Sequence, residues 1–417
     1  MKSPRLNFKY NELYQEQRLG EVTQWFSGGT PSKSNPDYWD GDIDWHTASS
    51  LKNTILHFSE TKISKLGLEN GSRIAEENSI LLLVRGSILF KKIPIGMLSR
   101  PAAFNQDVKS INCNPQLLPQ YLLQWLLAKE HQLLGVVVGT GIGAGKLETD
   151  SLKNLKILYP CLELQAKIAD FLSSVDEKIA LQNRKVELLQ QYKKGLIQKL
   201  FSQEIRFKDD DGFSFPSWVM TSFGKTYSFL TTNSLPRTCL TDDCGNIKNI
   251  HYGDIHTKYP ALLDSNIQQI PYIKEGIDTS KFEICKKGDL IIADASEDYN
   301  DIGKSIEIVV NNEVSPLVAG LHTFLARPTI DLATGFSGYL MQTEHIRRQI
   351  KVLATGISVL GISKSNLAKV TFCIPCKDEQ VKIINFLSSI DHKITLENTK
   401  LEKLKQWKQG LLQQMFV

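Results

Sequence analysis

The glycine-rich stretch GVVVGTGIGAGK, residues 135–146, has glycines at a spacing that could cradle a phosphate group. A phosphate-binding loop needs the pattern GxxxxGK followed by Ser or Thr, because backbone amides hold the phosphate and the hydroxyl holds magnesium. Thr140 occupies the place of the first glycine, and Leu147 follows Lys146. The dinucleotide-binding pattern GxGxxG also fails in every frame. We therefore predict a turn that leads into a strand rather than a nucleotide site.

Cysteine and histidine residues offer two sets of side chains that could ligate zinc. These sets are a lone CxxC pair, Cys373 and Cys376, and a scattered group, Cys239, Cys244, His251 and His256. Zinc sites usually show paired CxxC motifs or a tighter HxxxH spacing. We predict free cysteines and no metal site.

Residues for nucleophilic or methyl-transfer chemistry do not form a recognisable set. Five histidines lack a serine, cysteine or carboxylate arrangement typical of nucleophilic catalysis: His46, His57, His131, His322 and His345. The carboxylates Asp294, Glu297, Asp298 and Asp301 follow a strand-like run and are interpreted as solvated loop charges. The segment NPDY, residues 35–38, lacks the second proline of the NPPY loop with which amino-methyltransferases hold a base. We predict no catalytic residue and no cofactor.

Composition is that of a globular protein with two or three domains. Hydrophobic residues make up 41% of the chain and charged residues 23%, and the net charge is +4. No apolar run is long enough to cross a bilayer, so no membrane partner is predicted. The seven scattered cysteines favour a reducing compartment, and with no apolar leader at the start we expect a cytoplasmic protein.

Two phrases 215 positions apart are nearly identical. KIADFLSSVDEKI begins at Lys167 and KIINFLSSIDHKI begins at Lys382. The similarity runs without a gap from Pro160, opposite Pro375, to Phe201, and about half of these positions are identical. A fainter similarity continues upstream, where GTGIGAGKLETDSLKNL aligns with ATGISVLGISKSNLAKV at the same offset. Such repetition indicates internal duplication.

Each repeated segment carries a heptad of apolar residues, which predicts a coiled-coil seam. The seam residues are Ile168, Leu172, Val175, Ile179, Val186, Leu189, Leu196, Ile383, Leu387, Ile390, Ile394, Leu401, Leu404 and Leu411. Polar residues interrupt both copies at matching places, Gln182 with Glu397 and Lys193 with Lys408. Matched interruptions favour two helices that pair in a fixed register, over two amphipathic helices docked on separate cores.

Two serines precede Asp176 inside the first repeated phrase. Ser173 and Ser174 are residue types that cap helix starts, which predicts a short helix followed by a long one in each copy. A helix of some 35 residues would be a rod of roughly 50 Å.

The regions between the repeated segments diverge strongly, at about residues 20–150 and 222–365. They mix β-rich runs such as SILLLV (79–84) and DLIIAD (289–294) with helical runs such as QYLLQWLLAKEHQLL (120–134). The predicted fold class is therefore α+β. Similar frames with dissimilar inserts suggest a scaffold that presents two different reading domains.

Two polar loop-like stretches have the composition of nucleic-acid contacts. GGTPSKSNPDYWDGDIDWHTASSLKN (28–53) and HYGDIHTKYP (251–260) combine small polar, amide, basic and aromatic side chains. Amides and small polar groups position phosphates, and Asn, Gln, Arg, Lys and His can read base edges.

The whole chain resembles the specificity subunit of type I restriction–modification systems. The resemblance rests on GGTPSKSNPDYWDGDIDW, SILLLVRGSI and FNQD (104–107) in the first half. In the second half it rests on IHYGDIHTKY and GDLIIADASEDYNDIGK, and the repeated QxKIxxFLSSxDxKI completes it.

The resemblance implies two mixed α/β target-recognition domains, each reading one half of a split DNA sequence. The family's two conserved helices pack as an antiparallel coiled coil that fixes the gap, with an internal pseudo-twofold repeat. The implied domains are 1–160 for the first reading domain with an N-terminal arm, 161–204 for the first spacer helix, 205–375 for the second reading domain and 376–417 for the second spacer helix. The implied partners are double-stranded DNA, two modification (methyltransferase) subunits and restriction subunits, and the specificity subunit itself is non-catalytic.

Position by position, the resemblance gives two sets of DNA-binding candidates. The first domain supplies Thr30, Ser32, Lys33, Trp39, Trp45, Arg85, Ser87, Asn105 and Gln106. The second supplies His251, Tyr252, Asp254, His256, Lys258, Ser296 and His322. Because the first domain continues after Gly86 as SILFKK, where a glycine is expected, that turn is expected to differ. The alternative hypothesis is an interaction adaptor, with the same coiled coil and domains that grip proteins.

Overall fold

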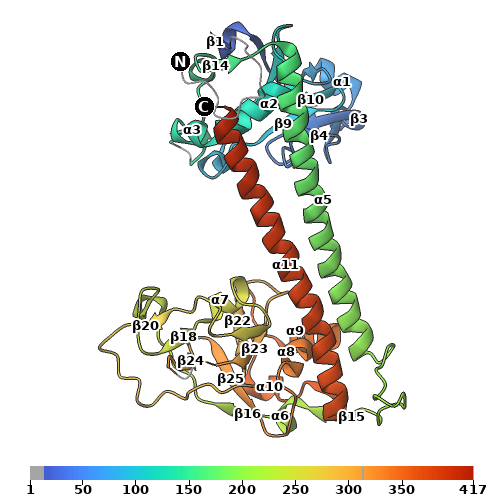
Figure 1. Ribbon diagram of the computed structural model, residues 1–417, viewed down its shortest axis with the longest axis vertical. Helices are drawn as coiled ribbons and strands as arrows, with labels where there is room; N and C mark the ends of the chain where they lie inside the picture. The colour runs from blue at the N-terminus through green and yellow to red at the C-terminus, as the bar shows by residue number, and fades with distance from the viewer. Residues whose placement is uncertain (1–13, 142, 312–313, 417) are drawn as a thin grey trace. The chain divides into compact units, whose positions relative to one another are not determined.

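The computed structural model describes residues 14–141, 143–311 and 314–416, which divide into two compact units. Unit 1 comprises residues 1–184 and 398–417, and unit 2 comprises residues 185–397. Two long helices, α5 (Leu162–Phe201) and α11 (Lys377–Met415), each contribute to both units (Figure 1). No helix in the described ranges is long and apolar enough to span a bilayer.

The two long helices run antiparallel within each unit. The core of unit 1 combines the first half of α5 with the last turns of α11, through Ile168, Leu172, Val175, Leu411 and Met415. The core of unit 2 combines the end of α5 with the start of α11, through Ile197, Leu200, Ile383 and Leu387. Because the start of one helix packs beside the end of the other in both units, the pairing is antiparallel.

The seam positions of both helices face inward. Nine of them are buried: Ile168, Leu172, Val175, Val186, Ile383, Leu387, Ile390, Leu401 and Leu411. The other five are half-buried: Ile179, Leu189, Leu196, Ile394 and Leu404. Residues between these positions are mostly exposed, so one apolar stripe runs along each helix.

The expectation of a helix break at Ser173 and Ser174 is wrong. Helix α5 is continuous from Leu162 to Phe201, and α11 is likewise unbroken. The Ser174 hydroxyl donates to the carbonyl of Asp170, one turn earlier, at 2.9 Å. The Ser174 hydroxyl therefore makes its hydrogen bond within the helix and does not cap a new one.

Two interhelical ion pairs occupy the polar interruptions at the lysine positions. Lys193 Nζ lies 2.5 Å from Asp391 Oδ1, and Lys408 Nζ lies 2.5 Å from Asp176 Oδ1. The two pairs are related by the 215-residue offset, since each lysine and each aspartate has its counterpart in the other copy. The repeat is therefore a symmetry of contacts as well as of sequence.

The second oxygen of each aspartate binds the adjacent globular domain. Asp391 Oδ2 accepts from the Tyr339 hydroxyl at 2.7 Å, and Asp176 Oδ2 accepts from Gln124 Nε2 at 3.0 Å. Tyr339 lies in α8 (Phe336–Leu340), and Gln124 lies in α2 (Pro119–Ala128). Tyr339 follows Gln124 by the same 215 positions, so each aspartate joins both long helices to its own domain.

A buried glutamine fixes the start of each long helix. Gln165 Oε1 accepts from the Leu118 amide at 2.8 Å, and its Nε2 donates to the Pro160 carbonyl at 2.9 Å. Gln380 makes the same two contacts with the residues 215 positions later. These contacts hold the chain that enters the helix against the domain helix, in both copies.

Unit 1 contains a five-stranded sheet, order β2-β11-β7-β9-β4, and a four-stranded sheet, order β5-β3-β10-β6. The first consists of β2 (Thr23–Ser27), β11 (Val108–Cys113), β7 (Ile80–Leu83), β9 (Ile95–Leu98) and β4 (Ile55–Leu56). The second consists of β5 (Lys62–Ile63), β3 (Trp39–His46), β10 (Ala102–Phe104) and β6 (Ile74–Ala75). Strand β7 is buried at every residue because both of its faces are covered.

Unit 2 repeats this arrangement with the sheet orders β16-β25-β21-β23-β19 and β17-β20-β18-β24. The first consists of β16 (Tyr227–Leu230), β25 (Thr323–Pro328), β21 (Leu290–Ala293), β23 (Ser305–Val310) and β19 (Leu262–Asp264). The second consists of β17 (Leu240–Thr241), β20 (Tyr272–Ile273), β18 (Lys248–Ile250) and β24 (Leu317–Ala319). The predicted strands in SILLLV and DLIIAD are β7 and β21, as expected.

Smaller elements complete both units. The chain before each long helix forms a two-stranded sheet with an upstream arm: β1 (Gln15–Arg18) with β14 (Lys156–Tyr159), and β15 (Val219–Ser222) with β27 (Thr371–Ile374). Residues 6–13 of the N-terminal arm lie outside the described ranges. The predicted helix at 120–134 is divided into α2 and α3 (Glu130–Gly135), and its counterpart into α8 and α9 (Glu344–Leu353). The glycine-rich stretch forms a hairpin of β12 (Val138–Gly139) and β13 (Gly145–Lys146), which confirms a turn there.

Glu307 on β23 is a buried carboxylate with no cationic partner among the described residues. Its oxygens accept from the amides of Gly335 at 2.5 Å and Gly338 at 2.7 Å. Burial raises the pKa of Glu307 to about 7, against the opposing effect of these amides. In unit 1, strand pairing places Met97 at the corresponding position.

Glu307 is expected to make unit 2 less stable as pH rises. Its pKa is higher in the folded state than the unfolded value of 4.5, so the folded state binds the proton more tightly. The resulting stabilisation is fully present below pH 4.5 and is lost as pH rises through about 7, which amounts to about 3 kcal/mol. Thermal unfolding of the wild type and of Glu307→Gln between pH 5 and pH 8.5 measures this difference. A parallel pH dependence in the two proteins would contradict the assignment.

Candidate nucleic-acid interface

Three segments of unit 2 meet at one edge of its two sheets. They are the end of β18 with the helix α7 (Tyr252–Thr257), the turn between β24 and β25, and the turn after β21. Because β18 and β24 pair in parallel, their carboxyl ends lie at the same edge. The amide of Gly320 donates to the Ile250 carbonyl at 2.9 Å and joins the first two segments.

Tyr252 lies at the centre of an aromatic cluster built from these segments. Its ring centroid is 4.7 Å from that of His251, 5.3 Å from that of His322 and 6.0 Å from that of His256. Aromatic rings at these distances hold one another in place by edge and offset contacts. The structure therefore brings His322 beside three predicted residues of the segment 251–256, which lies some 70 positions earlier in the chain.

His322 is held in an unusual backbone conformation at this edge. Its φ is +54°, in the left-handed region that few non-glycine residues adopt. The Asp294 amide donates to the His322 carbonyl at 3.1 Å, and Asp294 Oδ1 lies 3.2 Å from His322 Nδ1. The His322 side chain is about half exposed. The strained turn thus presents an imidazole to solvent with one ring nitrogen already engaged.

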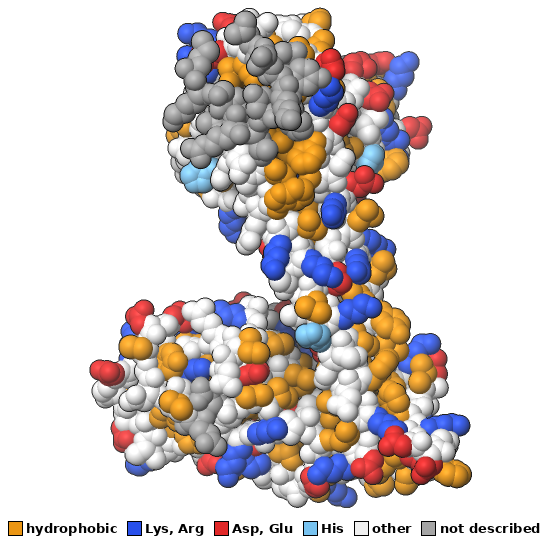
Figure 2. All heavy atoms as spheres, in the orientation of Figure 1, with side chains coloured by type: hydrophobic (Ala, Val, Ile, Leu, Met, Phe, Trp, Pro, Cys, Tyr) orange, Lys and Arg blue, Asp and Glu red, His pale blue; other side chains and the backbone are white. Residues whose placement is uncertain are grey.

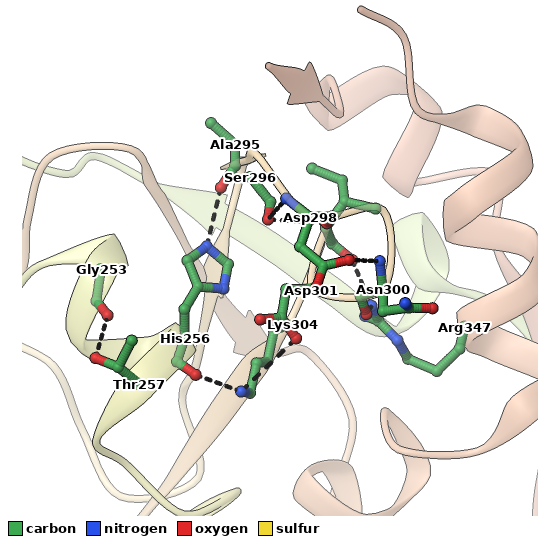
Figure 3. A network of polar contacts seen from close by, with 11 residues as sticks. Gly253, His256, Thr257, Ala295, Ser296, Asp298, Asn300, Asp301, Lys304 and Arg347 are labelled. Atoms are coloured by element: carbon green, nitrogen blue, oxygen red, sulfur yellow. Dashed lines mark hydrogen bonds and ion pairs between the residues drawn. The ribbon is translucent and has the colours of Figure 1, made fainter. Parts of the chain in front are cut away.

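His256 connects α7 to the turn after β21 (Figure 3). Its Nε2 lies 3.0 Å from the carbonyl of Ala295, so this nitrogen carries the proton, since a carbonyl can only accept. The other ring nitrogen, Nδ1, is buried and has no partner among the described residues. Ser296 stabilises the same turn, because its hydroxyl accepts from the Asp298 amide at 3.0 Å.

Not all predicted residues of unit 2 face solvent. Asp254 is buried and forms ion pairs with Arg237 and, at 3.1 Å, with Lys258. His251 accepts from the Gly253 amide at the start of α7, and its burial lowers its pKa, opposed by Asp254. Asp254 and His251 Nδ1 therefore shape the site, while Lys258 lies exposed on its margin.

The tryptophans of unit 1 organise the loop that precedes β3. Trp45 is buried and its Nε1 donates to the Gly29 carbonyl at 3.1 Å. Trp39 Nε1 donates to the Ser32 carbonyl at 3.1 Å, and the two indoles meet edge to face at 5.3 Å. Both indole donors are satisfied within the protein. Ser32 and Lys33, which the tryptophans position, are exposed at the loop tip.

The FNQD turn is also held by internal hydrogen bonds. Asn105 is buried, and its side-chain oxygen accepts from the Asp107 amide at 3.2 Å. Gln106 is exposed and its Oε1 accepts from the Thr30 hydroxyl at 2.5 Å. Thus Asn105 supports the turn, and Gln106 with Thr30 forms its outer surface.

Arg85 and Ser87 lie in the turn after β7. The Val84 and Arg85 amides both donate to the Asp107 carbonyl, which fixes this turn against the FNQD turn. Arg85 and Ser87 are exposed, and Arg85 has no side-chain partner among the described residues. Gly86 takes φ +155° before a short 3₁₀ turn that begins at Ser87, so the departure SILFKK makes a helical turn here. A free guanidinium of this kind can bind guanine edges or phosphates.

Strand register identifies residues that sequence reasoning missed. Parallel pairing aligns His46 with Phe104 in unit 1 and Ile250 with Ala319 in unit 2, so Thr47 corresponds to His251. Thr47 and Ser49 therefore belong to the unit 1 edge, where Ser49 is exposed. The sequence held a signal for this alignment, because β10 and β11 precede β24 and β25 by the same 215 positions.

Two aspartates of these edges were not among the DNA-binding candidates, although Asp107 belongs to the FNQD motif and Asp294 was interpreted as a solvated loop charge. The 215-residue offset places Asp107 at the position of His322, and strand pairing places Val84 at that of Asp294. Asp107 and Asp294 thus stand at corresponding edges but on different turns. The two edges have the same arrangement of strands and turns, but nearly all of their exposed side chains differ.

The side chains at both edges are suited to binding a partner through hydrogen bonds and charge. Hydroxyl, amide, imidazole and guanidinium groups project from turns, and no three potential metal ligands gather anywhere in the described ranges. On the face of unit 2 drawn in the lower part of Figure 2, basic and acidic side chains are interspersed. Sequence-selective contacts need such mixed donors and acceptors, whereas a uniformly basic surface would suit only phosphates.

Comparison with known proteins places this architecture in a family. The family model for the type I restriction modification DNA specificity domain matches residues 11–191 and 240–406. Because the model matches most of the chain, in two copies, the chain belongs to this family.

Individual relatives agree with this assignment. The specificity subunit of an Escherichia coli type I restriction enzyme is 30% identical over 41% of this chain, and the match spans 43% of that relative. The specificity subunit of a Methanocaldococcus jannaschii type I restriction enzyme is 24% identical over 95% of this chain and 90% of its own length. The crystal structure of the type I restriction–modification S subunit from M. genitalium has a similar fold, with a TM-score of 0.53 and 14% identity, covering 100% of this chain and 99% of that one. The fold class expected from the sequence is thereby confirmed.

Proposed function

We propose that this chain is the DNA-reading, non-catalytic specificity subunit of a type I restriction–modification complex. Each globular domain reads one half of a bipartite target on double-stranded DNA, through the edge described above. The paired helices set the gap between the two halves. Two modification subunits supply methylation, and restriction subunits join through the complex. The proposed domain limits are 1–160 and 205–375 for the reading domains, with 161–204 and 376–417 for the spacer.

One observation carries this proposal. The contacts that join the two long helices to the domains, called the frame below, repeat in both units, whereas the side chains exposed at the two edges differ. The ion pairs, the buried glutamines and the strands before each long helix repeat at a fixed offset of 215 residues. The exposed side chains at the two edges do not repeat: His251, Tyr252 and His322 stand where unit 1 has Thr47, Ala48 and Asp107. A repeated frame suits two copies of one partner, and unlike edges suit two unlike half-sites.

The double variant Tyr252→Ala, His322→Ala is expected to change or abolish reading of the second half-site and leave the first unchanged. A base contact is worth about 1–3 kcal/mol, so affinity for the full target should fall about 5- to 150-fold. The measurement is methylome sequencing of a host that carries the variant with its modification subunits. Binding of the purified complex to target duplexes gives the affinity.

Arg85→Ala is the reciprocal variant, since Arg85 is exposed at the unit 1 edge. It should relax the first half-site and leave the second intact. If wild-type complex shows no sequence enrichment from randomised duplexes, the DNA-reading proposal is wrong and the adaptor hypothesis replaces it. If either variant alters the half-site of the other domain, the assignment of one half-site to each edge is wrong.

A further inference from the structure

Unit 2 contains a cavity of about 420 Å³ between helix α5 and the loop that joins β21 to β23. Its charged lining residues come from three elements: α5, the loop and helix α9. The charged and amide residues that matter below are Lys193, Lys194, Asn300, Asp301, Lys304 and Arg347. All of them belong to unit 2.

The cavity carries more positive charge than its own carboxylate can neutralise. Lys193 is already paired with Asp391 on α11. Lys194 is exposed and has no hydrogen-bond or ion-pair partner in the described part of the chain. Lys304 lies 3.8 Å from Asp301, and the same carboxylate also acts on Arg347. Asp301 is the one carboxylate of the lining, so a single negative charge faces Lys194, Lys304 and Arg347. An uncompensated cationic pocket attracts an anion.

The Arg347 guanidinium, which could bind an anion, is held in place by backbone carbonyls. Its Nη2 donates to the carbonyls of Asn300 at 2.8 Å and Ile302 at 2.6 Å, as Figure 3 shows for Asn300. Within the described ranges no carboxylate lies within 4 Å of its guanidinium. Burial lowers the pKa of Arg347, opposed by Asp301. Carbonyl partners fix the orientation of the guanidinium without cancelling its charge, and its remaining N–H groups suit the oxygens of a phosphate.

The same loop serves both the cavity and the reading edge. Ala295 and Ser296 belong to the edge, and Asn300 to Lys304 belong to the cavity wall, within one short segment (Figure 3). Lys304 Nζ donates to the His256 carbonyl at 2.6 Å, so it ties the cavity to α7. A group bound in the cavity would thus lie next to the surface that meets DNA.

The helix side of the cavity wall repeats in unit 1 only in part. Lys193 on α5 recurs 215 positions later as Lys408 on α11. The counterpart of Lys194 is Gln409, which is exposed and carries no charge. The lysine that repeats is therefore the one in the interhelical ion pair, and the uncompensated lysine belongs to unit 2 alone.

The domain side of the wall does not recur at all. The repeat offset puts Gln132 where unit 2 has Arg347. The loops between the paired strands have equal lengths in the two units, which puts Phe90 and Pro94 where unit 2 has Asn300 and Lys304. A protein partner that binds both copies of the frame in the same way would need the same cavity residues in both units. We therefore expect the ligand of this cavity to contact unit 1 and unit 2 differently, as a DNA duplex with two unlike half-sites does.

We propose that this cavity binds a backbone phosphate of the target duplex, beside the second half-site. The inference rests on the proposed DNA-reading function and adds an anchor that only the second domain has. Lys194 and Arg347 supply the charge, and Asn300 can donate its amide to a phosphate oxygen. Such a contact is independent of sequence and fixes the register of the domain on the duplex.

Lys194→Gln tests the anchor, because this residue is exposed and its loss removes charge without removing an internal contact. The second copy already has a glutamine at the corresponding helix position, Gln409, so the variant should fold normally. Target affinity of the complex with modification subunits is measured at several salt concentrations. One lost phosphate contact lowers the slope of log K against log salt by about 0.9, and affinity at 0.1 M salt falls about five- to tenfold.

Lys178→Gln is the matched control for this measurement. Lys178 is an exposed lysine on the same helix, but it belongs to unit 1 and does not line the cavity. The control variant loses the same charge from α5, so its slope and its affinity should match those of the wild type. An equal loss of slope in both variants would show a general effect of helix charge and would overturn the anchor.

A second arm uses target duplexes in which one phosphate at a time is replaced by a neutral methylphosphonate. The wild type should lose affinity at one position beside the second half-site, and Lys194→Gln should lose less affinity there, because Arg347 remains. If the wild type reads its target but Lys194→Gln keeps the wild-type slope, the anchor is refuted while the reading function stands. Loss of the modification subunit from the Lys194→Gln complex, with the slope unchanged, would instead identify an acidic protein segment as the occupant. Absence of any target enrichment in the wild type would overturn the reading function itself, and the anchor with it.

Discussion

Insertion of one heptad into both long helices is expected to lengthen the gap between the half-sites and to leave both half-sites unchanged. The insertions go after Arg184 in α5 and after Glu397 in α11, where the chain passes from one unit to the other. A heptad preserves the seam, because its apolar positions repeat every seven residues. Seven helical residues add about 10 Å, which corresponds to at most about three base pairs. The gain is smaller if the domains must also follow the twist of the groove.

Methylome sequencing of a host with the variant reads both half-sites and their gap at once. Insertion into α5 alone is the informative control, because it leaves the two helices of unequal length. The unpaired heptad would put Lys193 and Asp391, or Lys408 and Asp176, out of register. We expect that control to lose activity. An altered half-site with an unchanged gap in the double insertion would refute the spacer role.

Asp391→Ala is expected to destabilise unit 2 by about 2 kcal/mol, which lowers its midpoint of thermal unfolding by about 4–8 °C. The carboxylate binds Lys193 on α5 and the Tyr339 hydroxyl, so its removal leaves the Lys193 ammonium unpaired and takes one of two partners from Tyr339. Lys193 is only 17% exposed, and an unpaired charge at such a site is costly. Differential scanning calorimetry of the complex measures the shift.

Two further variants separate the ion pair from its surroundings. His392→Ala changes the exposed neighbour and should leave the unfolding midpoint unchanged. Lys193→Met together with Asp391→Met removes both charges and should recover much of the lost stability, since apolar pairs often replace buried ion pairs without loss. Tyr339 keeps Ser388 as a partner at 3.2 Å in that variant. Equal destabilisation by the single and double variants would show that the charge pairing is not the cause.

The paired helices were readable from the sequence because their information is local and periodic. Heptads in both copies and matched polar positions predict pairing from spacing alone. The helix start was misread at Ser173 and Ser174. Whether a serine caps a helix or bonds within it depends on the conformation of the preceding turn, and Ser174 bonds to Asp170. Residue type alone does not decide between these outcomes.

The candidate edges were only partly readable. Loop composition pointed to Tyr252 and His256, and the family resemblance added His322. The structure gathers these three residues, but it also buries Asp254 and Trp45. Thr47 and Ser49 lie inside the polar stretch 28–53, but composition alone does not distinguish them from its other residues. Their position follows from the parallel pairing of β3 with β10, which joins segments more than fifty residues apart.

By itself, the sequence determined that the protein is duplicated, that its two helices pair, and that the frame repeats while the inserts differ. These properties follow from the heptad spacing and from the constant offset of 215 residues, both of which can be seen in the sequence itself. The tertiary structure alone decided which side chains reach the edge of each domain and that Glu307 is buried without a cation among the described residues. It also decided that Arg347 is fixed by carbonyls beside an open cavity. Such facts depend on contacts between distant segments, because burial and charge neutralisation are properties of neighbours in space.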